Sequence, residues 1–105
     1  MQEITLYENG QCMLGSDCYL VSVVRNFRLT PSQGIIHLYK NGEVYASITE
    51  AELEKSGVVI SNIRDFREIL EITLNDNWGM SQYHFNLTDG MVHNMYNEWL
   101  GGEQA

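Results

Sequence analysis

The sequence lacks long hydrophobic runs and contains little cysteine. No stretch approaches the roughly 18 apolar residues of a membrane span, and the first residues show no basic segment followed by an apolar one. The two cysteines, Cys12 and Cys18, are too few and too close together for a disulfide framework. We therefore expect a cytoplasmic protein with reduced thiols and no membrane partner.

Residue patterns that hold metals, phosphates or catalytic nucleophiles are also missing. The three histidines, His37, His84 and His93, are scattered, without His-x-x-x-His or Cys-x-x-Cys spacing. No glycine-rich loop leads into a helix, and no serine or cysteine stands in a recognisable order with a histidine and an acid. The sequence thus predicts no metal site, no cofactor and no enzymatic activity.

Positive charge is absent from the last third of the chain. Fourteen acidic residues oppose six basic ones, for a net charge of −8, and every lysine and arginine lies at or before Arg67. The segment 68–105 carries only acids: Glu68, Glu71, Asp76, Asp89, Glu98 and Glu103. A one-signed surface repels nucleic acid and speeds encounters with basic proteins. We expect no direct nucleic-acid binding, and the acidity serves either a basic protein partner or solubility alone.

The composition that is present is globular. With 105 residues, 44% of them hydrophobic and 19% charged, and no shift that would mark a linker, residues 1–105 are expected to form a single small acidic α+β domain. A chain of this length buries roughly 65% of the surface that its unfolded form exposes, which is enough to fold without disulfide bonds or a bound metal.

Alternating, strand-like segments fill the first half of the chain. We expect a first hairpin in which residues 4–7 turn at Glu8-Asn9-Gly10, then a largely buried strand at 18–24. A second hairpin is expected from residues 35–39 and 43–48 around Asn41-Gly42, and a further strand at 81–87. The sheet should therefore be mostly antiparallel and built from hairpins.

Capping patterns predict helices in the second half. Thr49 and Glu52 form a capping box for a short helix at 50–55 that ends at Gly57. Ser61 or Asn62 should begin a longer helix near 63–74, and Thr88 another near 89–100. Residues 75–80 read as a turn-rich connector. The two longer helices are expected to pack on one face of the sheet.

Reactive side chains receive ordinary structural explanations. Cys18 opens an apolar strand and should pack as a small hydrophobe, whereas Cys12, between two turns, could be exposed. His37 and Tyr39 should form a packing pair on one face of the second hairpin. Arg64 with Glu68, and Arg67 with Glu71, are expected as solvated i,i+4 pairs.

Two aromatic segments are candidates for recognition. Trp78 lies in the connector beside a glycine, where it is either an exposed interface anchor or, as we favour, a plug in the core. Met91, Met95 and Trp99 form one row of the last helix, for which burial against the sheet is favoured over contact with another subunit. The candidate partner-binding residues are Trp78, Met80, Tyr83, Glu50, Glu54, Asp76, Asp89 and Glu98.

Three function classes remain open. The leading hypothesis is a non-enzymatic protein-binding module with an acidic surface, comparable in type to phage or mobile-element inhibitors such as anti-restriction, anti-CRISPR and immunity proteins. Its partner would be a basic protein, which could itself bind nucleic acid. The alternative is a small assembly subunit, such as a virion component, that forms homo-oligomers through a strand edge or the methionine-tryptophan row. An unrecognised small enzyme comes third.

Overall fold

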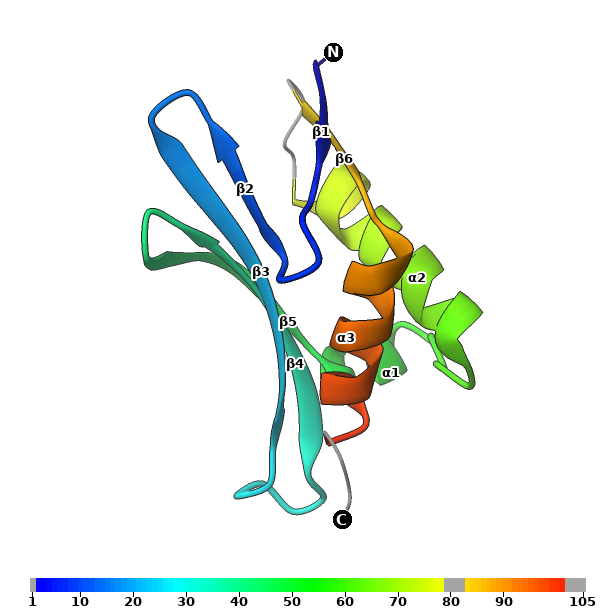
Figure 1. Cartoon of the computed structure of the whole chain (residues 1–105). Coiled ribbons are helices and arrows are strands. Elements are labelled where there is room, and N and C mark those ends of the chain that lie inside the picture. The colour runs from blue at the N-terminus through cyan, green and yellow to red at the C-terminus, as the bar shows by residue number, and fades with distance from the viewer. Residues whose placement is uncertain (1, 79–82, 102–105) are drawn as a thin grey trace.

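The structure, a computed structural model, describes residues 2–78 and 83–101, and within them the chain has an α+β fold (Figure 1). Met80, Glu103 and the beginning of the strand expected at 81–87 lie outside the described residues. In chain order the elements are β1 (Gln2–Thr5), β2 (Gln11–Leu14), β3 (Asp17–Asn26), β4 (Gln33–Lys40), β5 (Glu43–Thr49), α1 (Glu50–Lys55), α2 (Ile63–Ile72), the π-helical turn η1 (Thr73–Asn77), β6 (Tyr83–Asn86) and α3 (Asp89–Trp99).

The strands form two sheets. An antiparallel sheet contains four strands in the order β2-β3-β4-β5, and a smaller parallel sheet pairs β1 with β6. The helices and the small sheet all lie on one side of the larger sheet (Figure 1). The expected packing of the two longer helices on one face is thus confirmed, and α3 crosses directly over β3.

The hairpin of β4 and β5 is the one that the sequence predicted. Its turn residues Asn41 and Gly42 have φ of 53° and 85°, the left-handed conformations that a type I′ turn requires. A bulge between Leu38 and Tyr39 then shifts the register, so that Leu38 pairs with Ala46 and Tyr39 with Val44.

The predicted first hairpin is wrong. The turn at Gly10 forms, with its N–H donating to the Tyr7 carbonyl at 2.8 Å, but β1 does not pair with β2. Instead Ile4 lies opposite Phe85 in the parallel pair with β6, and both side chains are buried. β2 pairs with β3 across a turn at Gly15. Burial of Ile4 with Phe85 therefore outweighs the local Asn-Gly signal, which specifies a reversal of the chain but not its partner strand.

The helix caps form at residues that the sequence predicted. The Glu52 N–H donates to Thr49 Oγ1 at 3.2 Å, which confirms Thr49 as the cap of α1. The Glu52 carboxylate accepts from the Thr49 hydroxyl at 3.1 Å, whereas in a standard capping box it would accept from the Thr49 backbone N–H. Asn62 caps α2, and Thr88 caps α3. Each cap satisfies a backbone N–H that the first turn of a helix leaves without an intrahelical partner.

The connector after α2 is more helical than expected. Residues 73–77 continue the helix as the π-helical turn η1, where a loop was predicted from 75 onward. This turn buries Leu74 and brings Asn75 against β6, where its side chain both donates to the Phe85 carbonyl at 3.2 Å and accepts from the Phe85 N–H at 2.8 Å. Asn75 thereby mimics a neighbouring strand for β6.

The core lies between the larger sheet and the helices. Met91, Met95 and Trp99 of α3 are all buried there, which confirms the core interpretation of that row. Trp99 packs flat on β4 at Gly34, where an added Cβ would lie 2.6 Å from a ring carbon. The row is consequently not available as a subunit contact.

Candidate partner-binding surfaces

Glu50 is held inside the fold by Arg25. Its Oε1 lies 3.1 Å from Nη1 of Arg25 and accepts the Gly34 N–H at 2.9 Å. Arg25 also donates from Nε to the Trp99 carbonyl at 2.6 Å, and its guanidinium lies over the Trp99 ring. The carboxylate therefore joins the first turn of α1 to β3 and β4, and its charge is balanced within the molecule.

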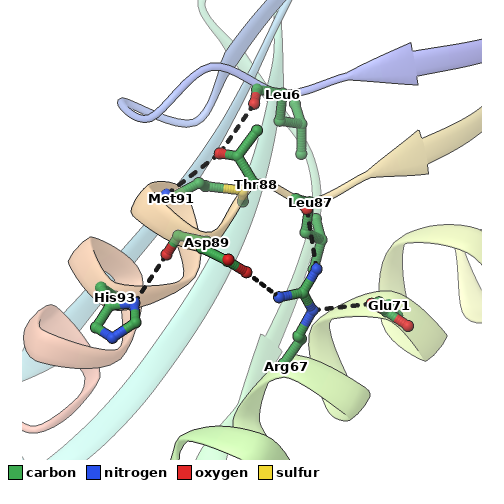
Figure 2. A network of polar contacts seen from close by, with 8 residues as sticks. All are labelled: Leu6, Arg67, Glu71, Leu87, Thr88, Asp89, Met91 and His93. Atoms are coloured by element: carbon green, nitrogen blue, oxygen red, sulfur yellow. Dashed lines mark hydrogen bonds and ion pairs between the residues drawn. The ribbon is translucent and has the colours of Figure 1, made fainter.

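Asp89 is paired as well, with Arg67 of α2 (Figure 2). Nη1 of Arg67 lies 2.6 Å from Asp89 Oδ1, Nη2 donates to the Leu87 carbonyl at 3.1 Å, and Nε lies 3.3 Å from Glu71 Oε1. Hydrogen bonds to Asp89 and then to Glu71 raise the pKa of the guanidinium. The expected Arg67–Glu71 pair is thus present, but Arg67 also connects α2 to the beginning of α3.

Glu54, Asp76 and Glu98 keep their charge directed to solvent. They lie on α1, η1 and α3 respectively, and all three are exposed. Among the described residues none of the three has an ion-pair or side-chain hydrogen-bond partner. Of the acids proposed to bind a partner, these three are the ones whose charge the fold leaves uncompensated.

The aromatic candidates pack partly on the core. Trp78 ends η1, with its N–H donating to the Thr73 carbonyl at 3.1 Å, and Tyr83 begins β6 opposite Gln2. Both side chains are half-buried against the hydrophobic core. Trp78 therefore contributes to packing while part of its surface is open to solvent, and a role in partner binding stays a prediction.

The expected environments of the cysteines are reversed in the structure. Cys12 is 2% exposed, whereas Cys18 is only half-buried. The register explains the difference, because Cys12 pairs with the inward-facing Tyr19 while Cys18 pairs with the exposed Met13. Burial, with a smaller contribution from Cys18, raises the pKa of the Cys12 thiol to about 11. Cys12 is accordingly a poor nucleophile.

The outer face of the larger sheet is a surface that the sequence did not reveal. We define it as the side chains that alternate with the buried ones in β2 to β5: Gln11, Met13, Cys18, Leu20, Ser22, Val24, Ile35, His37, Tyr39, Val44, Ser47 and Thr49. No described helix or strand covers it. The charged residues of these strands, Asp17, Arg25, Lys40 and Glu43, occupy the opposite, inward register positions.

This outer face is mostly apolar and slightly hollowed. Leu20, Tyr39 and Val44 lie side by side on three adjacent strands, and Val24 pairs with Ile35. At its centre a nitrogen of His37 lies 2.7 Å from the hydroxyl of Ser47, and the His37 ring lies 5.7 Å from that of Tyr39, which confirms their predicted packing. An open hollow of about 340 Å³ lies over Leu20 and Tyr39. The strand expected at 18–24 was predicted to be largely buried, whereas its alternate side chains Cys18, Leu20, Ser22 and Val24 belong to this outer face. The absence of charge at these positions was the available signal.

Comparison of the chain with protein-family models, with curated proteins and with solved structures found no match. Within residues 2–78 and 83–101, no cluster of three or more His, Cys, Asp or Glu could hold a metal ion. None of the helices described is both long and apolar enough to cross a membrane.

Proposed function

We propose that this chain is a non-enzymatic, cytoplasmic binding module that captures a basic protein by its acidic helical side. The observation that carries the proposal is that some of its acidic side chains are paired with arginines and others are not. Glu50 and Asp89 are balanced by arginines, whereas Glu54, Asp76 and Glu98 are exposed and have no partner among the described residues. The net charge of −8 adds a long-range attraction for a positively charged surface.

The expected energetics are those of steering more than of tight burial. Exposed ion pairs contribute about 0.2–1 kcal/mol each, so three of them supply specificity and a high association rate but only part of the affinity. An inhibitor of the type that phages and mobile elements carry would act in this way, by occupying the basic surface that its target uses.

The test compares two variants of equal charge. The first removes the proposed contacts with Glu54→Gln, Asp76→Asn and Glu98→Gln, and the control removes three exposed carboxylates that lie on no helix with Glu3→Gln, Glu8→Gln and Glu43→Gln. Each protein is immobilised and exposed to an extract of the native host, with elution by salt from about 0.05 to about 0.5 M, a range over which exposed charges become screened.

The proposal predicts that the wild type and the control variant retain the same basic protein and release it as salt rises, and that the first variant does not retain it. Equal loss in both variants would show that net charge alone is responsible. Retention that salt does not weaken would remove the electrostatic basis of the proposal.

A further inference from the structure

We infer that the outer face of the β2 to β5 sheet is an interface between two copies of this chain. The inference does not depend on the proposed function, because the outer face and the exposed acids Glu54 and Glu98 belong to different elements. Its starting point is the apolar content of the face. Val24 and Val44 are 40% and 57% exposed, on a surface that no described element covers. Contiguous apolar surface of this kind marks a site of protein contact.

The absence of charge on the outer face indicates which kind of partner can bind there. Two copies of a chain with net charge −8 repel each other, and this repulsion is smallest where the facing surfaces carry no carboxylates. The outer face meets that condition, because Asp17 and Glu43 are at inward register positions. A strongly basic protein or a nucleic acid would find no opposite charge there. The surface is therefore poorly matched to the partner proposed for the helical side and well matched to an identical surface.

The area of the outer face is sufficient for a weak dimer. The four strands have 4, 10, 8 and 7 residues, and with a rise of about 3.3 Å per residue and a spacing of about 4.8 Å they cover roughly 460 Å² per copy. Two such faces bury roughly 900 Å², which is in the range of weak and transient interfaces. Phe27 and Leu29, exposed on the loop between β3 and β4, lie at one end of the face and can extend it. Reversible association is the expected result.

The expected arrangement is a two-fold pair of stacked sheets. In a two-fold interface the same patch serves both partners, so the row of Leu20, Tyr39 and Val44 need only be complementary to the same face of the second copy. Sheets stacked in this way lie about 10 Å apart, with their strands inclined by about 30°. The four-stranded sheet would then be covered on both sides.

The test is the molecular mass in solution as a function of concentration. Sedimentation equilibrium of the wild type between about 1 µM and about 1 mM should show the mass rising from that of a 12.1 kDa monomer toward twice that value. Val24→Glu and Val44→Glu place a carboxylate on the outer face at exposed positions, and each should weaken the dimer by about tenfold or more.

The matched control is Val59→Glu. Val59 is 73% exposed and lies between α1 and α2, away from the outer face, so the same change of charge should leave the association unchanged apart from general repulsion. Thermal melting of all three variants verifies that they fold. A monomeric wild type at about 1 mM, or face variants that associate as well as Val59→Glu does, would overturn the inference.

Two further readouts separate this interface from the proposed basic partner. Added salt should strengthen the dimer, because it screens the repulsion between two acidic chains, whereas it should weaken capture of a basic protein. Cys18 lies on the outer face and Cys12 is buried, so alkylation of Cys18 should slow as the protein concentration rises. Alkylation of Cys18 at the monomer rate in a dimeric sample would place the interface elsewhere and contradict the inference.

Discussion

Arg25 and Glu50, which are 25 residues apart in sequence, meet at 3.1 Å beneath the carboxyl end of α3. Their side chains are 14% and 29% exposed, and Arg25 also donates to the carbonyls of Ser32 and Trp99. The pair therefore ties together the sheet, α1 and the last turn of α3. By contrast, the Arg67–Asp89 pair is shorter, at 2.6 Å, but Asp89 is 85% exposed.

The two ion pairs should differ in energy despite their distances. A double-mutant cycle with Arg25→Met and Glu50→Gln is expected to give a coupling energy of about 1–2 kcal/mol, because both groups are largely shielded from water. The same cycle with Arg67→Met and Asp89→Asn should give less than about 1 kcal/mol. Urea unfolding measures both. A stronger coupling at Arg67–Asp89 would mean that distance outweighs burial here.

Alanine should destabilise the fold at Gly34 but not at Gly90. At Gly34 a Cβ would lie 2.6 Å from the Trp99 ring, so Gly34→Ala should reduce the free energy of unfolding by about 1–3 kcal/mol. At Gly90 the nearest atom, at 2.8 Å, is the end of the flexible Glu8 side chain. Gly90→Ala should therefore be neutral or stabilise α3 by up to about 1 kcal/mol. Thermal melting of both variants tests the contrast.

Trp78→Ala should destabilise the domain, but less than truncation of a fully buried tryptophan. Because Trp78 is half-buried against the core, a loss of about 2–3 kcal/mol is expected, compared with about 3–5 kcal/mol for Trp99→Ala. Chemical unfolding gives both values. An unchanged stability in Trp78→Ala would show that Trp78 is not a plug, and would direct the search for a partner to this residue.

The stability of the fold should fall at alkaline pH through Cys12. The thiol has an ordinary pKa of 9.0 in the unfolded chain and about 11 in the folded one. Between these values the unfolded chain binds fewer protons, so the free energy of unfolding decreases as the pH rises from about 9 toward 11. The difference in stability between the wild type and Cys12→Ala cancels contributions that the two proteins share. The stability difference between the two proteins should narrow over this range, and a constant difference would contradict the assignment.

Local patterns in the sequence predicted the parts of the fold that local forces determine. Asn41-Gly42 specified its hairpin because two successive left-handed residues suit one turn type, and Thr49 and Thr88 marked helix starts through their own hydroxyls. The spacing of Met91, Met95 and Trp99 placed them on one buried side of a helix. In each case the residues that carry the sequence pattern lie within a few positions of the turn, cap or helix face that they specify.

The sequence failed where distant segments meet. The pairing of Ile4 with Phe85 joins residues 81 positions apart, and no local pattern names that partner. The absence of positive charge after Arg67 suggested an acidic segment without compensating charge, but in the folded chain Arg67 forms an ion pair with Asp89 of that segment. The outer face was missed because the strand expected at 18–24, which carries no charged residue, was predicted to be largely buried. Sequence patterning shows which side chains alternate but not which layers are available to cover them.

The parallel pair of β1 and β6 also has a consequence for the order of folding. The ladder from Gln2 to Thr5 needs residues 83–86, and the Leu6 N–H donates to Asn86. During synthesis the larger sheet from β2 to β5 can therefore form first, because its strands are joined by local turns. Ile4 and Leu6 stay exposed to solvent until the chain beyond residue 86 has left the ribosome. β1 is thus synthesised before β2 to β5 but reaches its final pairing after them, and in that interval the nascent chain exposes an unpaired strand.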